Sequence, residues 1–338
     1  MIIGCILKNW LGDVVFASAA IRAIKNNYPT SKIVCLAPER CVDILKASPY
    51  VDQVIPFDER STHRSTFAKL KLIRELRKLK FDQIYLFHRS FTRALIAFLA
   101  GAKQRIGYQT KHRSFLLTKS FTEPEQKIHS VDLFLDLVKR SGLQVASNAF
   151  YEFYFDKADL EKVKDLLSKR GIKFGRLVAL NPGANWPPKR WPAERFRDLA
   201  HELARRYDVN VIVTGGKSDL DLAQTIISGV RDPRVYSLCG ETNLCELGAL
   251  FSLCFLVISS DSGPLHIAGG VGANVIGIFG PTDPALTGPR GRGRNVVIQH
   301  VPDSQKIPWL GKCFPKNGWM EHISVEEVLS TIEREKLL

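Results

Sequence analysis

The chain of 338 residues lacks any apolar run of the roughly 18 residues that a membrane-crossing helix needs. Its beginning, Met1–Leu7, lacks a basic stretch and a cleavage site, so we expect a first strand there and not a signal peptide. The seven cysteines show no Cys-x-x-Cys spacing, which argues against a zinc site or a disulfide framework and favours a reducing cytoplasm. No Gly-x-Gly-x-x-Gly follows the first strand, which argues against a nicotinamide-dependent oxidoreductase.

Acidic residues are scarce in the first part of the chain. Residues 1–140 carry 24 Lys and Arg against 12 Asp and Glu, although the whole chain has a net charge of +14 and its remainder is nearly balanced. This excess predicts an anionic partner: nucleic acid, acidic lipid headgroups or a phosphorylated substrate. The absence of a helix-turn-helix, zinc-finger or base-stacking motif argues against nucleic acid. A solvated surface without a partner remains the alternative.

Short β-branched runs alternate with amphipathic helical stretches in both halves, which is typical of an α/β protein with parallel sheets. We expect two Rossmann-like, doubly wound domains, at residues 1–170 and 176–322, with a ligand-binding cleft between them. The segment 323–338 is expected to hold a last helix, capped by Ser324, that could pack back on the first domain.

The most informative segment spans residues 259–270 and reads S-S-D-S-G-P-L-H-I-A-G-G after a buried-strand pattern. A strand that turns directly into a helix aims backbone N–H groups and the helix dipole at one point, which attracts phosphate. Ser262 and Gly263 would offer such N–H groups, whereas Asp261 would repel phosphate and is expected to meet sugar hydroxyls. His266 is expected to contact phosphate or sugar, with a purely structural histidine as the alternative.

Five motifs occur in order over nearly the whole chain: N-W-L-G-D at 9–13, N-P-G-A at 181–184, K-R-W-P at 189–192, D-S-G-P-L-H at 261–266 and G-P-T-D-P at 280–284. Together they resemble the lipopolysaccharide heptosyltransferases, which are inverting glycosyltransferases of the GT-B fold and of sequence family 9. The N-W-L-G-D form is most similar to the heptosyltransferase II subtype, which adds the second inner-core heptose. The loop between Gly183 and Lys189 is slightly shorter than is usual for that subtype.

The resemblance implies that Asp13 is the base that deprotonates the acceptor hydroxyl as it attacks the anomeric carbon. An N-cap role for Asp13 in the following helix is a compatible alternative. Gly12 would let the backbone approach the donor closely, a plain turn glycine being the alternative. Lys189 would neutralise the donor pyrophosphate in the transition state, a solvated loop lysine being the alternative. Asn185 and Thr242 fall where the family contacts the nucleotide.

The basic first half holds the residues that we expect to bind the phosphates of a Kdo–lipid A inner-core acceptor: Arg89, Arg93, Arg105, Lys111 and Arg113. An amphipathic helix over residues 67–79 carries five basic residues, and we expect it to rest on the anionic inner face of the membrane. For each of these residues, simple solvated charge is the alternative.

The resulting hypothesis is a cytoplasmic, peripherally membrane-bound enzyme that transfers heptose from ADP-L-glycero-D-manno-heptose to the inner core of lipopolysaccharide. Neither a cofactor nor a metal is expected to be obligatory, since positive charge and a helix terminus can stabilise the leaving diphosphate. One alternative is a family 9 transferase with another sugar or acceptor, of the heptosyltransferase I type or acting on a protein. The other is a non-catalytic nucleotide-sugar binder.

Overall fold

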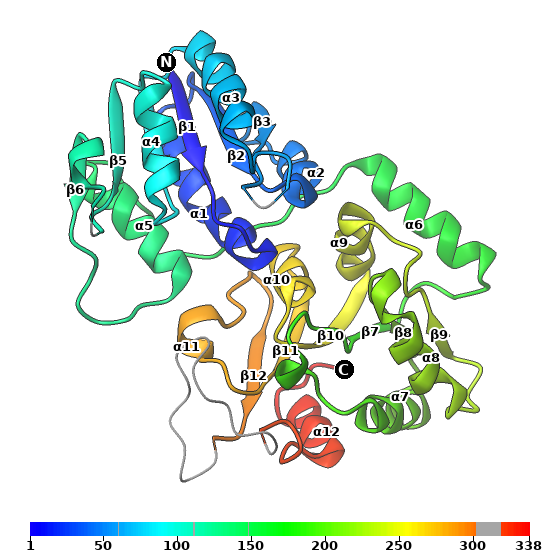
Figure 1. The fold of residues 1–338 in the computed structure, drawn as a ribbon. Helices are drawn as coiled ribbons and strands as arrows, with labels where there is room; N and C mark the ends of the chain where they lie inside the picture. The colour runs from blue at the N-terminus through cyan, green and yellow to red at the C-terminus, as the bar shows by residue number, and fades with distance from the viewer. Residues whose placement is uncertain (60, 111, 148, 302–318) are drawn as a thin grey trace. The chain divides into compact units, whose positions relative to one another are not determined.

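The computed structural model describes residues 1–59, 61–110, 112–147, 149–301 and 319–338, and it divides into two compact units, Met1–Tyr154 and Phe155–Leu338. Each unit contains one six-stranded, fully parallel sheet covered by helices (Figure 1). The expected α/β architecture of two doubly wound halves is therefore confirmed. The division lies after Tyr154 and not after residue 170, because the helix at Lys157–Lys169 (α6) packs on a helix of the second unit, Leu244–Ser252 (α9).

The first unit has the strand order β3-β2-β1-β4-β5-β6. Helices α1 and α5 lie side by side, while α3 and α4 pack with the apolar side chains of β1, β2 and β4 in one buried cluster. The elements are β1 Ile2–Ile6, α1 Leu11–Asn27, β2 Lys32–Ala37, the 3-10 helix η1 Glu39–Cys41, α2 Val42–Lys46, β3 Gln53–Pro56, α3 Thr66–Leu79, β4 Gln83–Leu86, α4 Phe91–Leu99, β5 Gln104–Tyr108, η2 Ser114–Leu116, β6 Lys119–Phe121 and α5 Ser130–Arg140.

The second unit has the strand order β12-β11-β10-β7-β8-β9. Helix α12 joins the buried cluster that α7 and α8 form with the sheet. The C-terminal helix therefore packs within this unit, and its expected packing on the first domain stays a prediction. Besides α6 and α9, the elements are β7 Leu177–Asn181, η3 Pro187–Lys189, α7 Ala193–Tyr207, β8 Asn210–Val213, η4 Lys217–Asp219, α8 Leu220–Ser228, β9 Val235–Ser237, β10 Cys254–Ser260, α10 Gly263–Gly270, β11 Asn274–Phe279, α11 Pro284–Thr287, β12 Asn295–Gln299 and α12 Val325–Arg334.

Both sheets reverse their strand order at one point. Counted along each unit's own chain, the order is 3-2-1-4-5-6 in both, and the reversal lies between β1 and β4 in one unit and between β7 and β10 in the other. In open parallel sheets the connections leave a crevice at the carboxyl ends of the two strands that flank the reversal. Two positions for ligands follow from topology alone.

Two edge strands and one helix start differ from the sequence prediction. The sequence prediction did not include β6 and β12, which are short strands with several exposed or partly exposed side chains. The first helix begins at Leu11 with Trp10 as its N-cap residue, so Asp13 lies inside the first turn and is not the cap. The cap at Ser324 is confirmed, since its hydroxyl accepts a hydrogen bond from the N–H of Glu327 at 3.1 Å.

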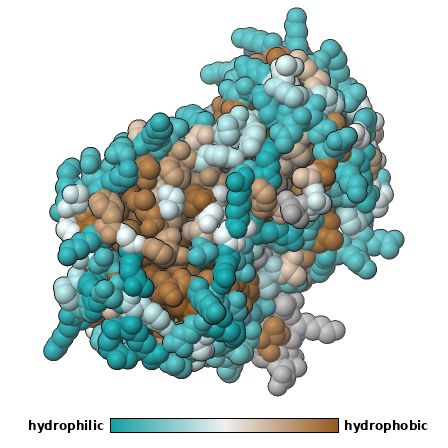
Figure 2. All heavy atoms as spheres, turned by 180° about the vertical axis from the view of Figure 1, so that it is seen from behind, coloured by the Kyte–Doolittle hydropathy of each residue, from teal (hydrophilic) through white to brown (hydrophobic). Residues whose placement is uncertain are grey.

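The surface carries both hydrophilic and hydrophobic side chains. On the face shown in Figure 2, hydrophilic residues project outward and hydrophobic residues appear between them in patches. In the described part of the chain, the largest exposed apolar side chains of the first unit are aromatic, with Phe67 at 77% and Phe115 at 74% exposure.

Lys80 offers a test of the helix ends. It follows α3 in the left-handed conformation, with φ 51° and ψ 58°, which glycine adopts without a steric penalty. We expect Lys80→Gly to raise the free energy of unfolding by about 0.5–1 kcal/mol. Lys78→Gly removes the same charge inside the last turn and should lower that free energy by about 1 kcal/mol. Urea unfolding measures both free energies. If both substitutions change the free energy of unfolding in the same direction, the left-handed backbone conformation of Lys80 is contradicted.

Candidate functional site

A buried polar network shapes the switch point of the second unit. Asn181 ends β7 and is 1% exposed, and its amide nitrogen lies 3.4 Å from the Ser259 hydroxyl and 3.3 Å from the Ser262 hydroxyl. The Thr214 hydroxyl donates to the Asn181 side-chain oxygen Oδ1 at 3.3 Å. Hydrogen bonds of this kind satisfy buried polar groups and fix their geometry. The ends of β7, β8 and β10 are thereby held together.

Lys189 and Asp261 form the charged centre of this edge. The Lys189 ammonium lies 2.6 Å from Asp261 Oδ2, and the Thr282 hydroxyl donates to the same oxygen at 2.6 Å. Asp261 is 4% exposed, whereas the Lys189 side chain is 22% exposed. The Lys189 side chain is therefore the part of this pair that is accessible to solvent. Thr282 was not singled out from the sequence, although it lies in the G-P-T-D-P motif.

The contacts of Asp261 give it a second role beside the expected one. One carboxylate oxygen holds Lys189 and Thr282, so the main function visible in this structure is to orient a lysine and a loop. A contact between Asp261 and sugar hydroxyls stays a prediction. The sequence could not reveal the ion pair, because its two residues are separated by 72 positions.

The start of α10 directly follows Asp261 in sequence. Ser262 is its N-cap residue in extended conformation, and Gly263 and Pro264 begin the helix. The first N–H groups of a helix have no partner within the helix and carry the positive end of its dipole. His266 follows in the first turns and is 4% exposed. The segment has the geometry that favours an anion.

The remaining donor residues expected from the sequence, Asn185 and Thr242, lie on loops at the same edge of the sheet. Asn185 is exposed after β7, and Thr242 is half-buried just before the N-cap of α9, Asn243. Asp219, after β8, accepts a hydrogen bond from the Gly216 N–H at 2.9 Å. A Cβ atom at Gly183 would lie 2.9 Å from the Asp219 carboxylate, so a larger residue there would displace this carboxylate. Because the strands are parallel, all these loops share the carboxyl edge.

An Asp-x-Asp spacing also occurs here, at Asp219-Leu220-Asp221. Its first carboxylate is engaged by the backbone of Gly216, and side chains two apart on a helix do not face each other. Within the described ranges, no group of three His, Cys, Asp or Glu side chains is placed to hold a metal ion.

The switch point of the first unit holds a second lysine–aspartate pair. Lys8 follows β1, and its ammonium lies 2.9 Å from Asp13 Oδ1 in the first turn of α1. Their side chains are 24% and 17% exposed, so both remain accessible. Gly12 lies inside α1 and has no positive φ, so it does not supply a special turn conformation.

Several residues that we expected to bind the acceptor have other partners. Arg89 is exposed and lies 2.5 Å from Glu123. Arg93 and Arg113 are 0% and 1% exposed, which corrects the expectation that their side chains face an acceptor. Arg105 donates to Leu116 O at 2.6 Å and lies over the Phe98 ring. Lys111 lies outside the described residues.

His88 follows β4 by two residues and lies within the positive field of this unit. Its Nδ1 accepts a hydrogen bond from the Ser90 N–H at 2.9 Å. Burial, followed by the repulsion of nearby cations with Arg93 foremost, lowers the pKa of His88 to about 3. The imidazole is therefore neutral at physiological pH.

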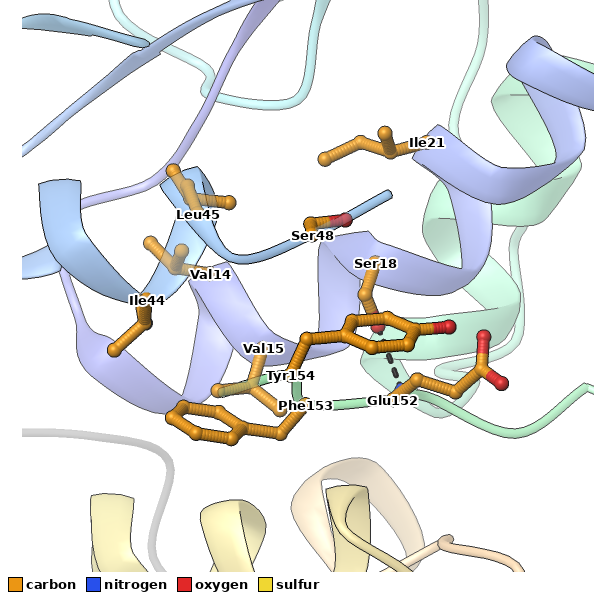
Figure 3. A pocket seen from close by; sticks show the side chains of 10 residues that line it. All are labelled: Val14, Val15, Ser18, Ile21, Ile44, Leu45, Ser48, Glu152, Phe153 and Tyr154. Carbon is orange, nitrogen blue, oxygen red and sulfur yellow. Dashed lines mark hydrogen bonds between the residues drawn. The ribbon is translucent and has the colours of Figure 1, made fainter. Parts of the chain in front are cut away.

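The cavity shown in Figure 3 lies elsewhere in the first unit. Side chains of α1 and α2 line it together with the segment Glu152–Tyr154, whose Glu152 N–H donates to the Ser18 hydroxyl. Its volume is about 20 Å³, which is enough for about one water molecule. It is a packing gap and not a ligand site.

The shifted pKa of His88 predicts a pH effect on stability. The unfolded state, with a histidine pKa near 6.5, binds more protons than the folded state, so the free energy of unfolding should fall as the pH drops from about 6.5. His88→Asn keeps an acceptor for Ser90 and should reduce this dependence. Urea unfolding between about pH 4.5 and 7 measures it, with the exposed His201→Asn as control. An unchanged slope in His88→Asn would contradict the burial of a neutral imidazole.

None of the helices in the described part of the chain combines the length and apolar composition needed to cross a membrane. Among solved structures, the fold is similar to that of "E. coli ADP-heptose lps heptosyltransferase II", with a TM-score of 0.81 at 22% identity over 100% of this chain and 98% of the other. A "glycosyl transferase family 9" protein from Veillonella parvula gives a TM-score of 0.88 at 23% identity, over 99% and 96% of the two chains. These likenesses establish the GT-B fold.

Sequence relatives point the same way. The chain is 24% identical to "Lipopolysaccharide heptosyltransferase 2" of Escherichia coli K12, over 86% of this chain and 85% of that protein. It is 28% identical to "Lipopolysaccharide heptosyltransferase 3" of the same strain, over 96% and 94%. Residues 69–309 match the family described as "Glycosyltransferase family 9 (heptosyltransferase)". The chain belongs to this family of glycosyltransferases.

Proposed function

We propose that this glycosyltransferase moves heptose from ADP-heptose to the inner core of lipopolysaccharide, as a heptosyltransferase of the II type. The observation that carries the proposal is the arrangement at the β7–β10 switch point. There a partly exposed lysine, fixed by a buried aspartate, accompanies the start of α10 in a family whose printed description is heptosyltransferase. A cation and a helix N-terminus together suit a diphosphate.

In the proposed reaction, the second unit binds the donor. Lys189 and the backbone N–H groups of Ser262 and Gly263 hold the ADP phosphates and receive the negative charge that develops as the sugar–phosphate bond breaks. Asn185 and Thr242 lie toward the nucleoside, and Asp261 and His266 toward the sugar. These positive groups can stabilise the leaving group without a metal, so none is proposed as obligatory.

The first unit supplies the base. The Asp13 carboxylate takes the proton of the acceptor hydroxyl while that oxygen attacks the anomeric carbon. A single displacement of this kind inverts the configuration at the anomeric carbon. Lys8 contacts the carboxylate and orients it. Exposed basic residues such as Arg89 remain candidates for the acceptor's phosphates.

The subtype and the alternatives can be separated by their acceptors. The relatives include heptosyltransferases 2 and 3, so acceptors that carry no heptose, one heptose or two heptoses should be compared with the same ADP-heptose. We expect transfer to the acceptor with one inner-core heptose. Transfer only to the heptose-free acceptor would indicate the I type, and donor binding without transfer to any acceptor would indicate a non-catalytic binder.

Asp13→Asn tests the base. It keeps the size of the side chain but removes its basicity, so transfer should fall about 10²–10⁴-fold. Affinity for ADP-heptose, measured by calorimetry, should remain, because the proposed donor residues belong to the other unit. Asp43→Asn is the matched control, since Asp43 is also a first-turn aspartate paired with a lysine. Equal loss of binding and transfer in Asp13→Asn would contradict the assignment.

Lys189→Met tests the donor site. A charge-assisted hydrogen bond is worth about 1.5–3 kcal/mol, so the variant should bind ADP and ADP-heptose roughly 10–100-fold more weakly. Lys162→Met removes an exposed lysine of the same unit that also pairs with carboxylates, and it should bind normally. Calorimetry measures these affinities on variants whose thermal midpoint of unfolding is unchanged. Unchanged affinity in Lys189→Met would remove Lys189 from the donor site.

The proposal includes peripheral binding to an anionic membrane through α3. This helix buries Leu72, Ile73 and Leu76 and leaves Phe67 and Leu70 exposed beside a basic face. An aromatic side chain among basic residues is suited to an anionic bilayer surface. The enzyme would thereby stay close to a lipid-anchored acceptor.

Charge reversal tests this contact. Lys71→Glu, Arg74→Glu and Lys78→Glu together should weaken binding to phosphatidylglycerol vesicles at least about 100-fold, since each basic residue near the surface contributes about 1 kcal/mol. Three reversals on α6, at Lys157, Lys164 and Lys169, give the matched control. Co-sedimentation with vesicles measures binding, and equal loss in both triple variants would contradict a specific role for α3.

A further inference from the structure

Arg93 is a charged side chain in the interior of the first unit. It extends from the first turn of α4 and is 0% exposed. Its Nη1 donates to Leu7 O, its Nη2 donates to Asn9 Oδ1, and its Nε donates to Glu59 Oε2 at 3.1 Å. The guanidinium lies over the Phe57 ring, 5.1 Å from its centroid. Every nitrogen of the guanidinium therefore has a partner.

A buried arginine of this kind is costly. Burial lowers the pKa of Arg93, and the ion pair with Glu59 opposes that shift. Replacing a buried ion pair by apolar groups is often neutral or stabilising, so stability alone does not account for such a pair. What a guanidinium offers is geometry, because its planar fork fixes the relative positions of two acceptors.

The two acceptors of the fork lie in the turn that leads into α1. Leu7 and Asn9 flank Lys8, whose ammonium contacts Asp13. The N-cap residue of α1, Trp10, provides no side-chain capping bond. Arg40 donates to Asn9 O. Two arginines from distant elements thus donate hydrogen bonds to this turn.

We propose that Arg93 is a positioning residue, which acts through the Leu7–Asn9 turn to hold Lys8 and Asp13 in the orientation that proton removal requires. This inference rests on the proposed function of Asp13. Glu59 serves as the counter-ion that keeps the guanidinium in place. The acceptor itself does not contact Arg93.

Arg93→Lys is the discriminating variant, because lysine keeps the charge but has no fork. A displacement of about 1 Å in a reacting group can cost about 100-fold in rate. We expect kcat for heptose transfer to fall about 10–100-fold, while KM for ADP-heptose stays within about twofold. A purely structural role would lower the thermal midpoint and leave kcat per folded molecule unchanged.

Arg22 provides a matched control within the same unit. It pairs with Glu152, donates to Phe150 O and lies over the Phe150 ring, which repeats the chemistry of Arg93 away from the turn. Arg22→Lys should lower the thermal midpoint but not kcat. Equal losses of kcat in Arg93→Lys and Arg22→Lys would overturn the inference.

A double-mutant cycle with Asn9 tests the route. Asn9→Ala removes one acceptor of the fork, so Arg93→Lys should cost much less kcat in that background than alone. If the kcat losses of Arg93→Lys and Asn9→Ala simply multiply in the double variant, the two residues act independently and the inference is overturned. If Arg93→Lys does not fold, Asn9→Ala with an intact thermal midpoint carries the test, and an unchanged kcat overturns the inference.

Asp13→Asn separates this inference from the proposed function. If Asp13→Asn retains transfer, the assignment of the base fails. If Asp13→Asn loses transfer but Arg93→Lys does not, only the positioning role fails.

Discussion

The reversal of strand order in each sheet is the constraint on which the rest of the structure depends. Between β1 and β4, and between β7 and β10, neighbouring strands send their connections in opposite directions. A crevice opens there at the carboxyl edge of the sheet. Chain segments that are far apart in sequence meet at that edge, and both lysine–aspartate pairs form there. Residues of separate sequence motifs are thereby brought together at one edge of the sheet in each unit.

The two pairs have the same chemistry but present different charges. Asp261 is buried and also accepts from Thr282, so Lys189 is the accessible partner. An ammonium has three donors, and one engaged by a carboxylate leaves others for a phosphate. At the other switch point both Lys8 and Asp13 are accessible, which leaves a carboxylate oxygen within reach of solvent. The second unit is thus suited to receive negative charge and the first to receive a proton.

Sequence reasoning succeeded where chain order decides position. Parallel strands place the loop that follows each strand at one edge, so the strand-to-helix segments at Asp13 and at 259–270 could be located before any coordinates. The ion pair between Lys189 and Asp261 could not, because it depends on which strands are neighbours. The edge strand β6, K-S-F, was missed because it lacks the apolar pattern that marks central strands. The edge strand β12 does contain a β-branched run, V-V-I, which the sequence prediction overlooked.

The interior arginines show where reasoning from charge fails. A basic residue in a sequence is taken as surface, since most of them are exposed. Yet Arg113 is 1% exposed and donates to Tyr108 O and His88 O, which holds the loop between β4 and α4. Arg93 does the same for the turn between β1 and α1.

Some of the excess basic residues of the first half are therefore buried and hold loops in place. They add little to the positive electrostatic field at the surface. The proposed attraction of this unit for an anionic partner must come from the basic residues that remain exposed, and α3 gathers several of them on one face. Net charge counted along a chain measures such an attraction only after the buried guanidinium groups are set aside. A count of charges can therefore predict an anionic partner, but it cannot distinguish the arginines that could contact this partner from the buried Arg93 and Arg113.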